Sequence, residues 1–448
     1  PSELNQDRMD ERFDCIIVGG GIAGLSAAMT LARADARFLL AERGEFVGAK
    51  NVSGGVLWGT DLARLVPEYW TMDAGFERYV THRRLSFLDE TSAFTIDFKS
   101  AHFDQRPYSG LIVLRSRFDQ WLADQVQSVI DAGSHAEDSF IATNVLVDEM
   151  IVENGRVTGI RTGGESFHAD VVILAEGVNN LLTRQLGLQS EYVPPKGMAT
   201  GVKEVIRFDR KVLEDRFQLD DRSGLTNEFL GFASGGVEGG GFLYTNLDSL
   251  SVGLVLDIAD LGRKKRKPYD LLNEFKRHPA VAPMIDGGEV VEYSAHVVSS
   301  GDMSVMPKEV YCDGALIAGE AANLVLNSGK AIQGMDFAMR SGILAAETVL
   351  SAKEDRDHSV QSLARYRKAL EGSYVMQDLR NFQDAVKFLH SPAMFTEVPN
   401  VMCEFGRQYF TITNEPARKA TRSLLDSVKK HSSLWSLIKL GRKAARSL

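Results

Sequence analysis

The chain has 448 residues, a formal net charge of −9 and 44% hydrophobic residues. Its length exceeds one ordinary domain, and its composition is typical of a globular protein in water, so we expect two or three hydrophobic cores. Three widely spaced cysteines, Cys15, Cys312 and Cys403, exclude a disulfide framework and a four-cysteine iron–sulfur cluster within this sequence. No metal-binding motif is present, and we expect no metal site.

Two further features predict where the protein works. No segment reaches the roughly 18 uninterrupted apolar residues that a membrane-spanning helix needs. Residues 1–11 are polar and lack the apolar core of a secretion signal. Together these features predict a cytoplasmic location.

The first predicted elements form a dinucleotide-binding unit. An apolar strand over residues 13–18 is followed by Gly19, Gly21 and Gly24 in the spacing G-x-G-x-x-G. These glycines permit a tight turn, a close approach of the backbone to a pyrophosphate, and close packing of the next helix. The N–H groups at the start of that helix attract phosphates. Glu42 ends the second predicted strand, where an acid accepts a hydrogen bond from a ribose hydroxyl.

Strands and helices alternate beyond this unit. A basic cluster at 263–267 is interpreted as an exposed loop, with partner docking as the alternative. The other predicted elements, in chain order, are a hairpin at 84–98, a helix from Arg115, a hairpin over 141–160 turning at Asn154-Gly155, a strand over 170–174, a strand-rich region over 196–298 with a helix before His278, a buried strand over 314–319, and helices beyond Gly329.

Elements typical of a nucleotide-binding sheet thus occur at three separate places. An ordinary NAD dehydrogenase keeps its unit contiguous, whereas a divided layout favours a large flavin fold with FAD extended across the sheet. We expect an α/β fold with a discontinuous Rossmann-like FAD-binding domain, similar to glutathione reductase or hydroxybenzoate hydroxylase, a strand-rich α+β substrate domain and a helical C-terminal region. The expected boundaries are 1–80, 106–195 and 299–350 for the FAD-binding domain, 81–105 and 196–298 for the substrate domain, and 351–448 for the helical region.

Three short signals support FAD. Arg115 begins R-x-x-F-D-x-W-L, where flavoprotein monooxygenase-like enzymes place an arginine that contacts the cofactor. Ala175 and Gly177 match an A-x-G turn that packs against the adenosine half. Gly319 and Glu320 replace the usual Gly-Asp, whose acid binds the ribityl chain, so the direct ribityl contact of Glu320 is in question. Each signal alone is also typical of a plain buried strand end, but their order together favours FAD.

The chain resembles the FixC family, flavoproteins related to the electron-transfer-flavoprotein:quinone oxidoreductases. The segments that carry the resemblance are 48–57, 201–205, 241–246, 276–279, 287–289 and 334–347. The resemblance implies an FAD-dependent oxidoreductase that accepts electrons from an electron-transfer flavoprotein and passes them to a quinone. Longer relatives carry a ferredoxin-like cluster domain, which implies here a separate ferredoxin-like iron–sulfur subunit. The cofactor would carry the redox step, so no catalytic side chain is assigned.

The predicted site has two parts. Tyr244 is also explained as a core tyrosine, and His82, His102 and His296, which are candidates for proton transfer, are also explained as structural residues. For the quinone we expect contacts from Gly240, Gly241, Tyr244 and Thr245. For FAD we expect contacts from Gly19, Gly21, Ala23, Gly24, Glu42, Arg43, Lys50, Gly54, Gly55, Arg115, Val145, Ala175, Gly177, Gly319, Glu320, Gly334 and Met335.

The segment 418–448 carries nine Lys/Arg and one acidic residue, interleaved with apolar residues. This pattern favours an amphipathic basic helix on an anionic membrane surface, on the inner side of the membrane, or on an acidic partner. A terminal helix packed on its own domain is the alternative. No stacking platform accompanies the basic residues, so nucleic acid is not expected.

Three other functions share parts of this pattern. A geranylgeranyl-reductase-like enzyme would reduce prenyl double bonds on the same fold. A flavin monooxygenase would oxidise NAD(P)H without a protein partner. An electron-conduit subunit would be inactive alone and would work only within an assembly.

Overall fold

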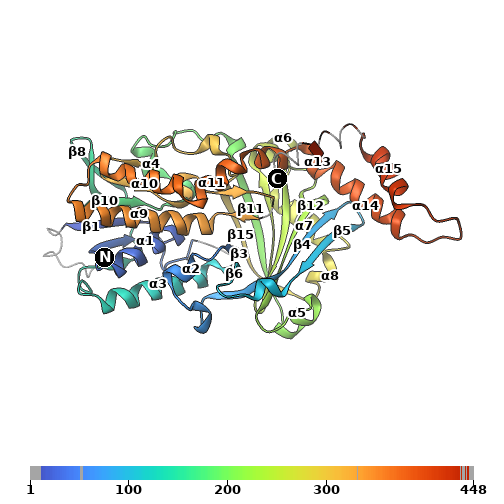
Figure 1. Ribbon diagram of the computed structural model, residues 1–448, viewed down its shortest axis with the longest axis horizontal. Helices are drawn as coiled ribbons and strands as arrows, with labels where there is room; N and C mark the ends of the chain where they lie inside the picture. The colour runs from blue at the N-terminus through green and yellow to red at the C-terminus, as the bar shows by residue number, and fades with distance from the viewer. Residues whose placement is uncertain are drawn as a thin grey trace.

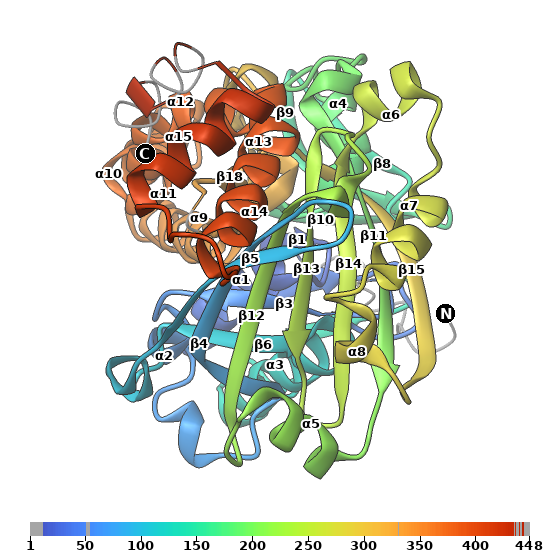
Figure 2. The same cartoon turned by 90° about the vertical axis from the view of Figure 1, so that its right-hand side faces the viewer.

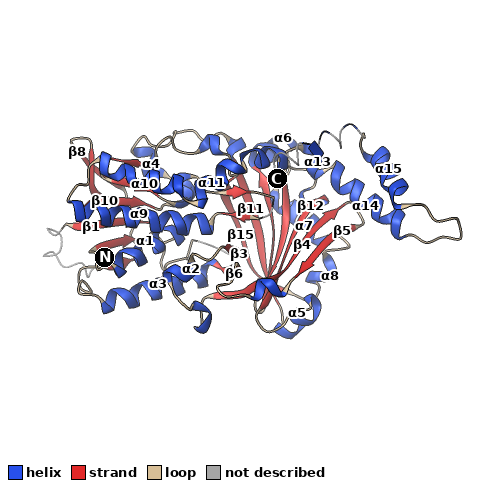
Figure 3. Cartoon of the chain, in the orientation of Figure 1, coloured by secondary structure: helices blue, strands red, loops and turns tan. Residues whose placement is uncertain are grey.

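The computed structural model describes residues 12–50, 54–329, 331–433, 435, 439, 441 and 442. The described chain is built on two large sheets (Figure 1). Figure 3 shows helices around the eight-stranded sheet at one end and the long strands of the nine-stranded sheet at the centre. Residues 1–11, for which the sequence predicts the absence of a secretion signal, lie outside the described residues.

The eight-stranded sheet contains the predicted dinucleotide-binding strands. Its central strands pair in parallel, in the order β16-β17-β10-β1-β2-β7. These strands are apolar on both faces because both are covered. On one face Ile17 and Leu40 pack with side chains of helices, and on the other Ile16 and Leu39 pack with side chains of the antiparallel strands at 149–162. The strands are β1 (Phe13–Val18), β2 (Phe38–Ala41), β7 (Phe140–Ala142), β8 (Glu149–Glu153), β9 (Arg156–Thr162), β10 (Glu165–Leu174), β16 (Tyr311–Cys312) and β17 (Ala315–Ile317).

This sheet is assembled from three separate stretches of the chain, as the sequence predicts. The helix α1 (Ile22–Arg33) packs between α3 (Arg115–Ala132) and α9 (Met335–Asp355). The close contact of α1 with α9 depends on Gly342, where a Cβ atom would lie 2.1 Å from the carbonyl oxygen of Ala23. The two helices therefore meet backbone to backbone at this point.

The nine-stranded sheet is mostly antiparallel. Its order is β15-β11-β14-β13-β12-β4-β6-β3, with β5 beside β4. Figure 2 shows the long central strands side by side. Its strands are β3 (Gly54–Trp58), β4 (Phe76–Leu88), β5 (Ala93–Lys99), β6 (Gly110–Leu114), β11 (Met198–Arg207), β12 (Ser223–Gly231), β13 (Gly239–Thr245), β14 (Ser249–Asp257) and β15 (Glu289–Ser299).

The two faces of this sheet differ. One face packs its apolar side chains, such as Val202 and Leu254, with Phe275 in a buried cluster. We call the opposite face, which carries Lys203 and Phe242, the inner face. The helices of this half are α5 (Arg210–Phe217), α6 (Ile258–Lys264), α7 (Pro268–Arg277) and α8 (Ala282–Ile285).

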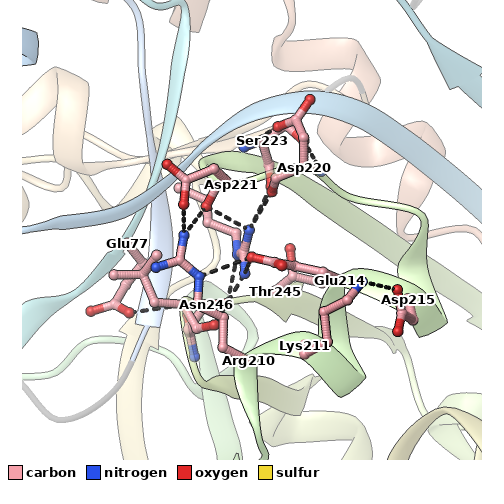
Figure 4. A network of polar contacts seen from close by, with 12 residues as sticks. Glu77, Arg210, Lys211, Glu214, Asp215, Asp220, Asp221, Ser223, Thr245 and Asn246 are labelled. Atoms are coloured by element: carbon pink, nitrogen blue, oxygen red, sulfur yellow. Dashed lines mark hydrogen bonds and ion pairs between the residues drawn. The ribbon is translucent and has the colours of Figure 1, made fainter.

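A buried arginine joins two loops by hydrogen bonds at one end of the sheet. Arg78, on β4, is 0% exposed. Its guanidinium donates to the carbonyl oxygens of Asn246 (2.8 Å) and Leu247 (3.0 Å), and to those of a neighbouring turn. The turn oxygens belong to Asp220, Asp221 and Ser223. Figure 4 shows this network, in which Glu214 supplies the nearest carboxylate at 3.5 Å.

Most of the remaining helices form the C-terminal region, and two short ones precede it. Among the described residues, no helix combines the length and apolar character needed to cross a bilayer. The elements not yet named are α2 (Leu62–Leu65), α4 (Leu181–Gln185), α10 (Val360–Gly372), α11 (Tyr374–Asn381), α12 (Gln383–Leu389), α13 (Pro392–Phe395), α14 (Glu397–Phe410) and α15 (Ala420–His431), and the short strands β18 (Leu326–Asn327) and β19 (Ile332–Gln333).

The structure corrects three of the predicted elements. The hairpin expected over 141–160 is confined to β8 and β9, because the Asn154-Gly155 turn pairs only nearby residues, while β7 joins β2 instead. The basic cluster at 263–267 is not simply a loop: Arg263 and Lys264 end α6 and pair with Asp260. The region beyond Gly329 starts with β19 rather than a helix.

The second sheet also recruits strands from outside the range expected for it. β3 and β6 fall within 1–80 and 106–195, which the sequence assigns to the FAD-binding domain. They nevertheless pair with each other, and β6 pairs with the start of β4. We call the part of the molecule built on the eight-stranded sheet the cofactor half. Through β3 and β6 the nine-stranded sheet therefore extends to the cofactor half.

Candidate functional site

The predicted glycine turn lies between β1 and α1. Gly19 has a φ of +104°, and a Cβ atom there would lie 2.4 Å from the carbonyl oxygen of Ala175. A Cβ atom on Gly24 would lie 1.9 Å from the carbonyl oxygen of Gly19. Only glycine satisfies both contacts, so the turn holds β1, β10 and α1 together as close packing of strand and helix requires.

The start of α1 is suited to a phosphate group. Its N-cap, Gly21, makes no side-chain cap, and its first turn contains no acidic residue. The first N–H groups of a helix have no partner within the helix, and the dipole places partial positive charge there. The side chain of Ala23 is small and buried in this turn, so the residues present fit a pyrophosphate.

Glu42 organises the neighbouring loop. It follows β2 and is 9% exposed. One carboxylate oxygen accepts a hydrogen bond from Gly20 N (2.8 Å) and the other from Gly44 N (2.6 Å). Its backbone carbonyl accepts from Val145 N at 2.9 Å. Each carboxylate oxygen keeps a second lone pair, which is available to a ribose hydroxyl.

A second turn lies beside the first. Ala175 N donates to Val18 O (2.8 Å), and Gly177 follows with a φ of +75° and open space where a Cβ would stand. The short helical turn Gly319–Ala322 contacts the turn Gly177–Asn179. Gly319 also has a positive φ, +69°, and its missing Cβ leaves room for Ala23. The structure therefore brings the glycines of all three stretches together.

Arg115 and Glu320 extend the site toward the nine-stranded sheet. Arg115 begins α3 and donates two hydrogen bonds to Asp119, at 2.9 and 2.8 Å. Glu320 accepts from Ser299 N at 3.0 Å, at the end of β15. Burial raises the pKa of Glu320, and the charge of Arg115 partly offsets that rise. Glu320 therefore contacts the second sheet, which a shorter aspartate would not reach as readily.

The predicted residues on β3 meet the start of α9. A Cβ atom on Gly55 would lie 3.1 Å from Cε of Met335, directly after Gly334. A Cβ on Gly54 would lie 2.5 Å from Oγ of Ser251 on β14. β3, at the edge of the second sheet, thus lies between the start of α9 and Ser251 on the inner face of the same sheet.

Two other predicted residues stand apart from this packed region. Arg43 and Lys50 are exposed in the loop after β2. Arg43 is close enough to His296 for its charge to lower the pKa of that imidazole. Among the described residues, no contact places Lys50 near the glycine turns.

A charged cluster on the inner face was missed by sequence reasoning. Lys203 on β11 lies near Arg115 and Glu292, and burial together with the charge of Arg115 lowers its pKa to about 8, despite Glu292. Burial, Lys203 and Arg115 lower the pKa of His296 on β15. Burial raises the pKa of Glu292. The sequence signal was Lys203 within an apolar strand, inside the family segment 201–205.

The four residues predicted for quinone lie on opposite faces of β13. A Cβ on Gly241 would lie 3.0 Å from Phe275 of α7, and Thr245 Oγ1 accepts from Leu225 N inside the core. Gly240 and Tyr244 point to the inner face, because side chains alternate along a strand. The structure therefore separates Gly241 and Thr245 from Gly240 and Tyr244.

Tyr244 belongs to an aromatic and charged group on the inner face. Its ring stacks on Phe242 with centroids 4.9 Å apart, and it packs, as Trp58 does, against a small buried cluster on β3, β4 and β6. Arg83 lies 4.6 Å above the Trp58 ring. Burial raises the pKa of Glu228 to about 7, with Arg83 opposing the rise, so this carboxyl titrates near neutral pH.

The other histidines lie elsewhere. His82 is buried on β4 and pairs with Asp97. His102 is exposed in a short helical turn. Neither contacts the glycine turns, and only His296 of the three is near the charged cluster.

Three family models match the chain. The model for FAD dependent oxidoreductase covers residues 14–135, the model for ETF-QO, ubiquinone-binding, covers 198–298, and the ETF-QO/FixC family C-terminal domain covers 385–448. With the glycine-lined turns and the divided sheet, these matches define an FAD-dependent oxidoreductase. The cofactor is FAD, as the sequence predicts.

Curated relatives match over nearly the whole length. Protein FixC from Escherichia coli O157:H7 is 42% identical over 98% of this chain and 100% of its own. The probable electron transfer flavoprotein-quinone oxidoreductase YdiS from Escherichia coli K12 is 40% identical with the same coverage. The chain belongs to the FixC family, related to the electron-transfer-flavoprotein:quinone oxidoreductases.

Solved structures share the fold at low identity. A geranylgeranyl bacteriochlorophyll reductase-like protein from Thermoplasma acidophilum has a TM-score of 0.70 and 20% identity, covering 96% of this chain and 99% of its own. The flavin-dependent brominase Bmp2 has a TM-score of 0.63 and 16% identity, covering 85% and 87%. The α/β flavoprotein fold is confirmed, and these likenesses carry no activity to this chain.

Proposed function

We propose that this chain accepts electrons from an electron-transfer flavoprotein and passes them through FAD to a quinone. The observation that carries the proposal is the inner face of the nine-stranded sheet, which combines aromatic side chains with Glu228 and Lys203 and reaches the cofactor half through Arg115. The ubiquinone-binding model over 198–298 supports it. The printed name of the relative YdiS supports the two redox partners.

The chain's own residues have distinct tasks in this proposal. The N–H groups at the start of α1, with the turn from Gly19 to Gly24, hold the pyrophosphate. Glu42 binds the adenosine ribose, and Glu320 with the start of α9 faces the ribityl and ring end. Bound FAD supplies reversible two-electron redox chemistry.

Quinone reduction also consumes two protons, and the inner face can supply them. We place the quinone head group beside Tyr244, with its ring against the aromatic side chains. Glu228, with its pKa of about 7, and Lys203, with its pKa of about 8, both change protonation close to neutral pH. Groups that titrate near the working pH are the most effective proton donors and acceptors.

Two further partners belong to the proposal. The 448 residues contain three cysteines, fewer than the four that hold a ferredoxin-like cluster, so we propose a separate iron–sulfur subunit. We also propose an anionic membrane surface as the site of work. Its support is the end of α14 together with the loop that leads to α15. Phe410 and Ile412 are exposed there, and so are Arg418 and Lys419. The tail residues 434, 436–438, 440 and 443–448 lie outside the described residues.

The proposal is tested by following the flavin absorbance under anaerobic conditions. Reduced electron-transfer flavoprotein should bleach the bound FAD, and a soluble quinone analogue should restore it. Glu228→Gln should slow the quinone step by about 10²-fold and leave the first step unchanged, since it removes a proton donor. Glu289→Gln, at an exposed residue of β15, is the matched control.

Two outcomes would overturn the proposal. One is a flavin that no electron-transfer flavoprotein reduces and that NAD(P)H reduces readily, which would favour a monooxygenase-like enzyme. The other is a flavin that is reduced by its partner but is not reoxidised by any quinone analogue.

A further inference from the structure

Three side chains outside the cofactor site converge at one end of the nine-stranded sheet. Glu238 directly precedes β13, Asp257 ends β14, and His390 lies in the turn between α12 and α13. One potential ligand atom from each residue lies within 4.8 Å of the other two. His390 Nδ1 and Glu238 Oε1 are hydrogen-bonded. Within the described residues this is the group of histidine and acidic side chains close enough to share a metal ion.

Asp257 distinguishes this cluster from an ordinary surface ion pair. The residue is only 5% exposed. Its Oδ1 accepts a hydrogen bond from Asp260 N at 2.7 Å, whereas Oδ2 is buried and has no hydrogen-bond partner among the described residues. A buried carboxylate oxygen is unfavourable unless a cation or a proton compensates its charge.

Backbone hydrogen bonds hold the main chains of Glu238 and Asp257 beside each other. Asp257 N donates to Glu238 O, and Glu238 N donates to Asp260 Oδ2, each at 2.8 Å. Asp260 is itself paired with Arg263 and Lys264, so its charge is already balanced. The hydrogen bond from Asp260 N to Asp257 Oδ1 orients the carboxylate itself, as outer groups do in metal sites of proteins.

We propose that Glu238, Asp257 and His390 bind one divalent metal ion of the Zn²⁺ type, which joins the α12–α13 turn to the end of the second sheet. One imidazole nitrogen and two carboxylate oxygens suit Zn²⁺, whereas Mg²⁺ and Ca²⁺ prefer oxygen ligands alone. Tetrahedral Zn²⁺ with bonds of about 2.1 Å places its ligand atoms about 3.4 Å apart. This separation is within the 4.8 Å that spans the three candidate ligand atoms here.

Access and coordination are both satisfied. Three protein ligands leave the fourth position of a tetrahedral ion to water. The side chains of Glu238 and His390 are 23% and 28% exposed, which gives the ion and its water a route from solvent. The sequence shows no metal motif here because the ligands come from three segments that meet only in the folded chain.

The test measures Zn²⁺ binding to untagged, FAD-loaded protein. The protein is treated with a chelator, dialysed and titrated with Zn²⁺ against a chromophoric zinc chelator, and metal content is measured by mass spectrometry. We expect one Zn²⁺ per chain. His390→Gln and Asp257→Asn should each weaken binding at least tenfold, and Zn²⁺ should raise the melting temperature of the wild type but of neither variant.

Controls separate a lost ligand from a lost fold. His135→Gln changes a histidine outside this cluster, whose Nδ1 lies 3.5 Å from Asp138 Oδ2. This variant should bind Zn²⁺ like the wild type. Asp257→Asn keeps the shape of the side chain and removes a buried charge, so it should retain its FAD. Wild-type protein that takes up no Zn²⁺, or binds it no more tightly than His390→Gln, would overturn the proposal. This readout does not depend on quinone or on an electron donor.

Discussion

Lys203 stands on β11 with Arg115 and Glu292 as its charged neighbours. A lysine in this position loses hydration on folding, and the nearby guanidinium makes its charged form less favourable still. Its pKa therefore falls from 10.5 to about 8. At the scale of single residues, the inner face holds groups whose protonation changes within the range where enzymes work.

We predict that quinone reduction falls as the pH rises through about 8, because the charged, proton-donating form of Lys203 is lost there. Lys203→Met should lower the rate and remove this part of the pH profile, whereas Lys203→Arg should keep a charge at all these pH values. The measurement is the rate of flavin reoxidation by a quinone analogue from pH 6 to 10. An unchanged alkaline limb in Lys203→Met would assign the titration to another group.

The same residue predicts a dependence of stability on pH. Between about 8 and 10.5 the unfolded chain keeps a proton at Lys203 that the folded chain has released. The contribution of this group to the free energy of unfolding therefore rises with pH in that window. Comparing urea unfolding of the wild type and Lys203→Met at both ends of the window isolates this contribution.

Arg78 carries a third prediction at this scale. Its guanidinium serves five carbonyl oxygens in the buried end of the sheet. Arg78→Met leaves those oxygens without their donor and should lower the free energy of unfolding by about 3–5 kcal/mol. Arg207→Met, at an arginine that is 59% exposed and whose partner Glu289 is 73% exposed, should change it by less than about 1 kcal/mol in the same urea titration.

In the candidate FAD site, the glycine turn and the position of Glu42 were predictable from residues close in sequence. The turn from Gly19 to Gly24 depends on local spacing, and Glu42 follows at the end of the next strand. Lys203 and Glu228 were not predictable, because a charged residue in an alternating strand normally indicates a solvent-facing side. In this fold that side faces the cofactor half, and only the pairing of distant strands shows it.

At the scale of elements, the contact between α1 and α9 supports the glycine turn from Gly19 to Gly24. Local periodicity predicted both helices, but nothing in either segment indicates that they touch. β3 and β6 were not predicted as strands, and their apolar runs are compatible with either sheet. The type of the long periodic elements was therefore predictable from short windows, whereas sheet membership depended on partners far along the chain.

We predict that Gly342→Ala weakens FAD binding. Its added Cβ atom would lie 2.1 Å from Ala23 O, so α9 must move away from α1 and from the glycine turn. The FAD content of the purified protein should fall, and the melting temperature with it. Gly372→Ala, at the end of α10 with open space around it, should leave both unchanged. Equal FAD content in the two variants would contradict this role of the helix contact.

At the scale of the whole molecule, the cofactor half and the α14–α15 pair lie at opposite ends (Figure 1). The small buried residues Ser423 and Ser427 of α15 lie toward α14, which it contacts, while Leu424 and Leu425 remain partly exposed. Part of the basic helix therefore packs on its own domain, and its apolar residues are still available to a surface. The nine-stranded sheet occupies the distance between this surface and the flavin site.

We predict that the end of α14 and the loop between α14 and α15 bind anionic vesicles. Phe410 is 73% exposed and Ile412 is 95% exposed. Because burying one large apolar side chain contributes about 1.5–3 kcal/mol, Phe410→Ser with Ile412→Ser should weaken binding at least about tenfold. Flotation with vesicles of anionic lipid measures it. Val290→Ser with Val297→Ser, exposed residues of β15, should bind as the wild type does.

The packing of α9 against α1 also determines when the cofactor can be taken up. Chains leave the ribosome from the N-terminus, and domains generally fold as they are completed. Here α1 can pack against α9 only after Gly342 has been synthesised, and β10 can pair with β17 only after residue 317. Both contacts are needed to complete the glycine turns of the candidate FAD site. A nascent chain must therefore hold its N-terminal third in an incomplete state through most of translation. We therefore expect flavin insertion to follow the synthesis of α9.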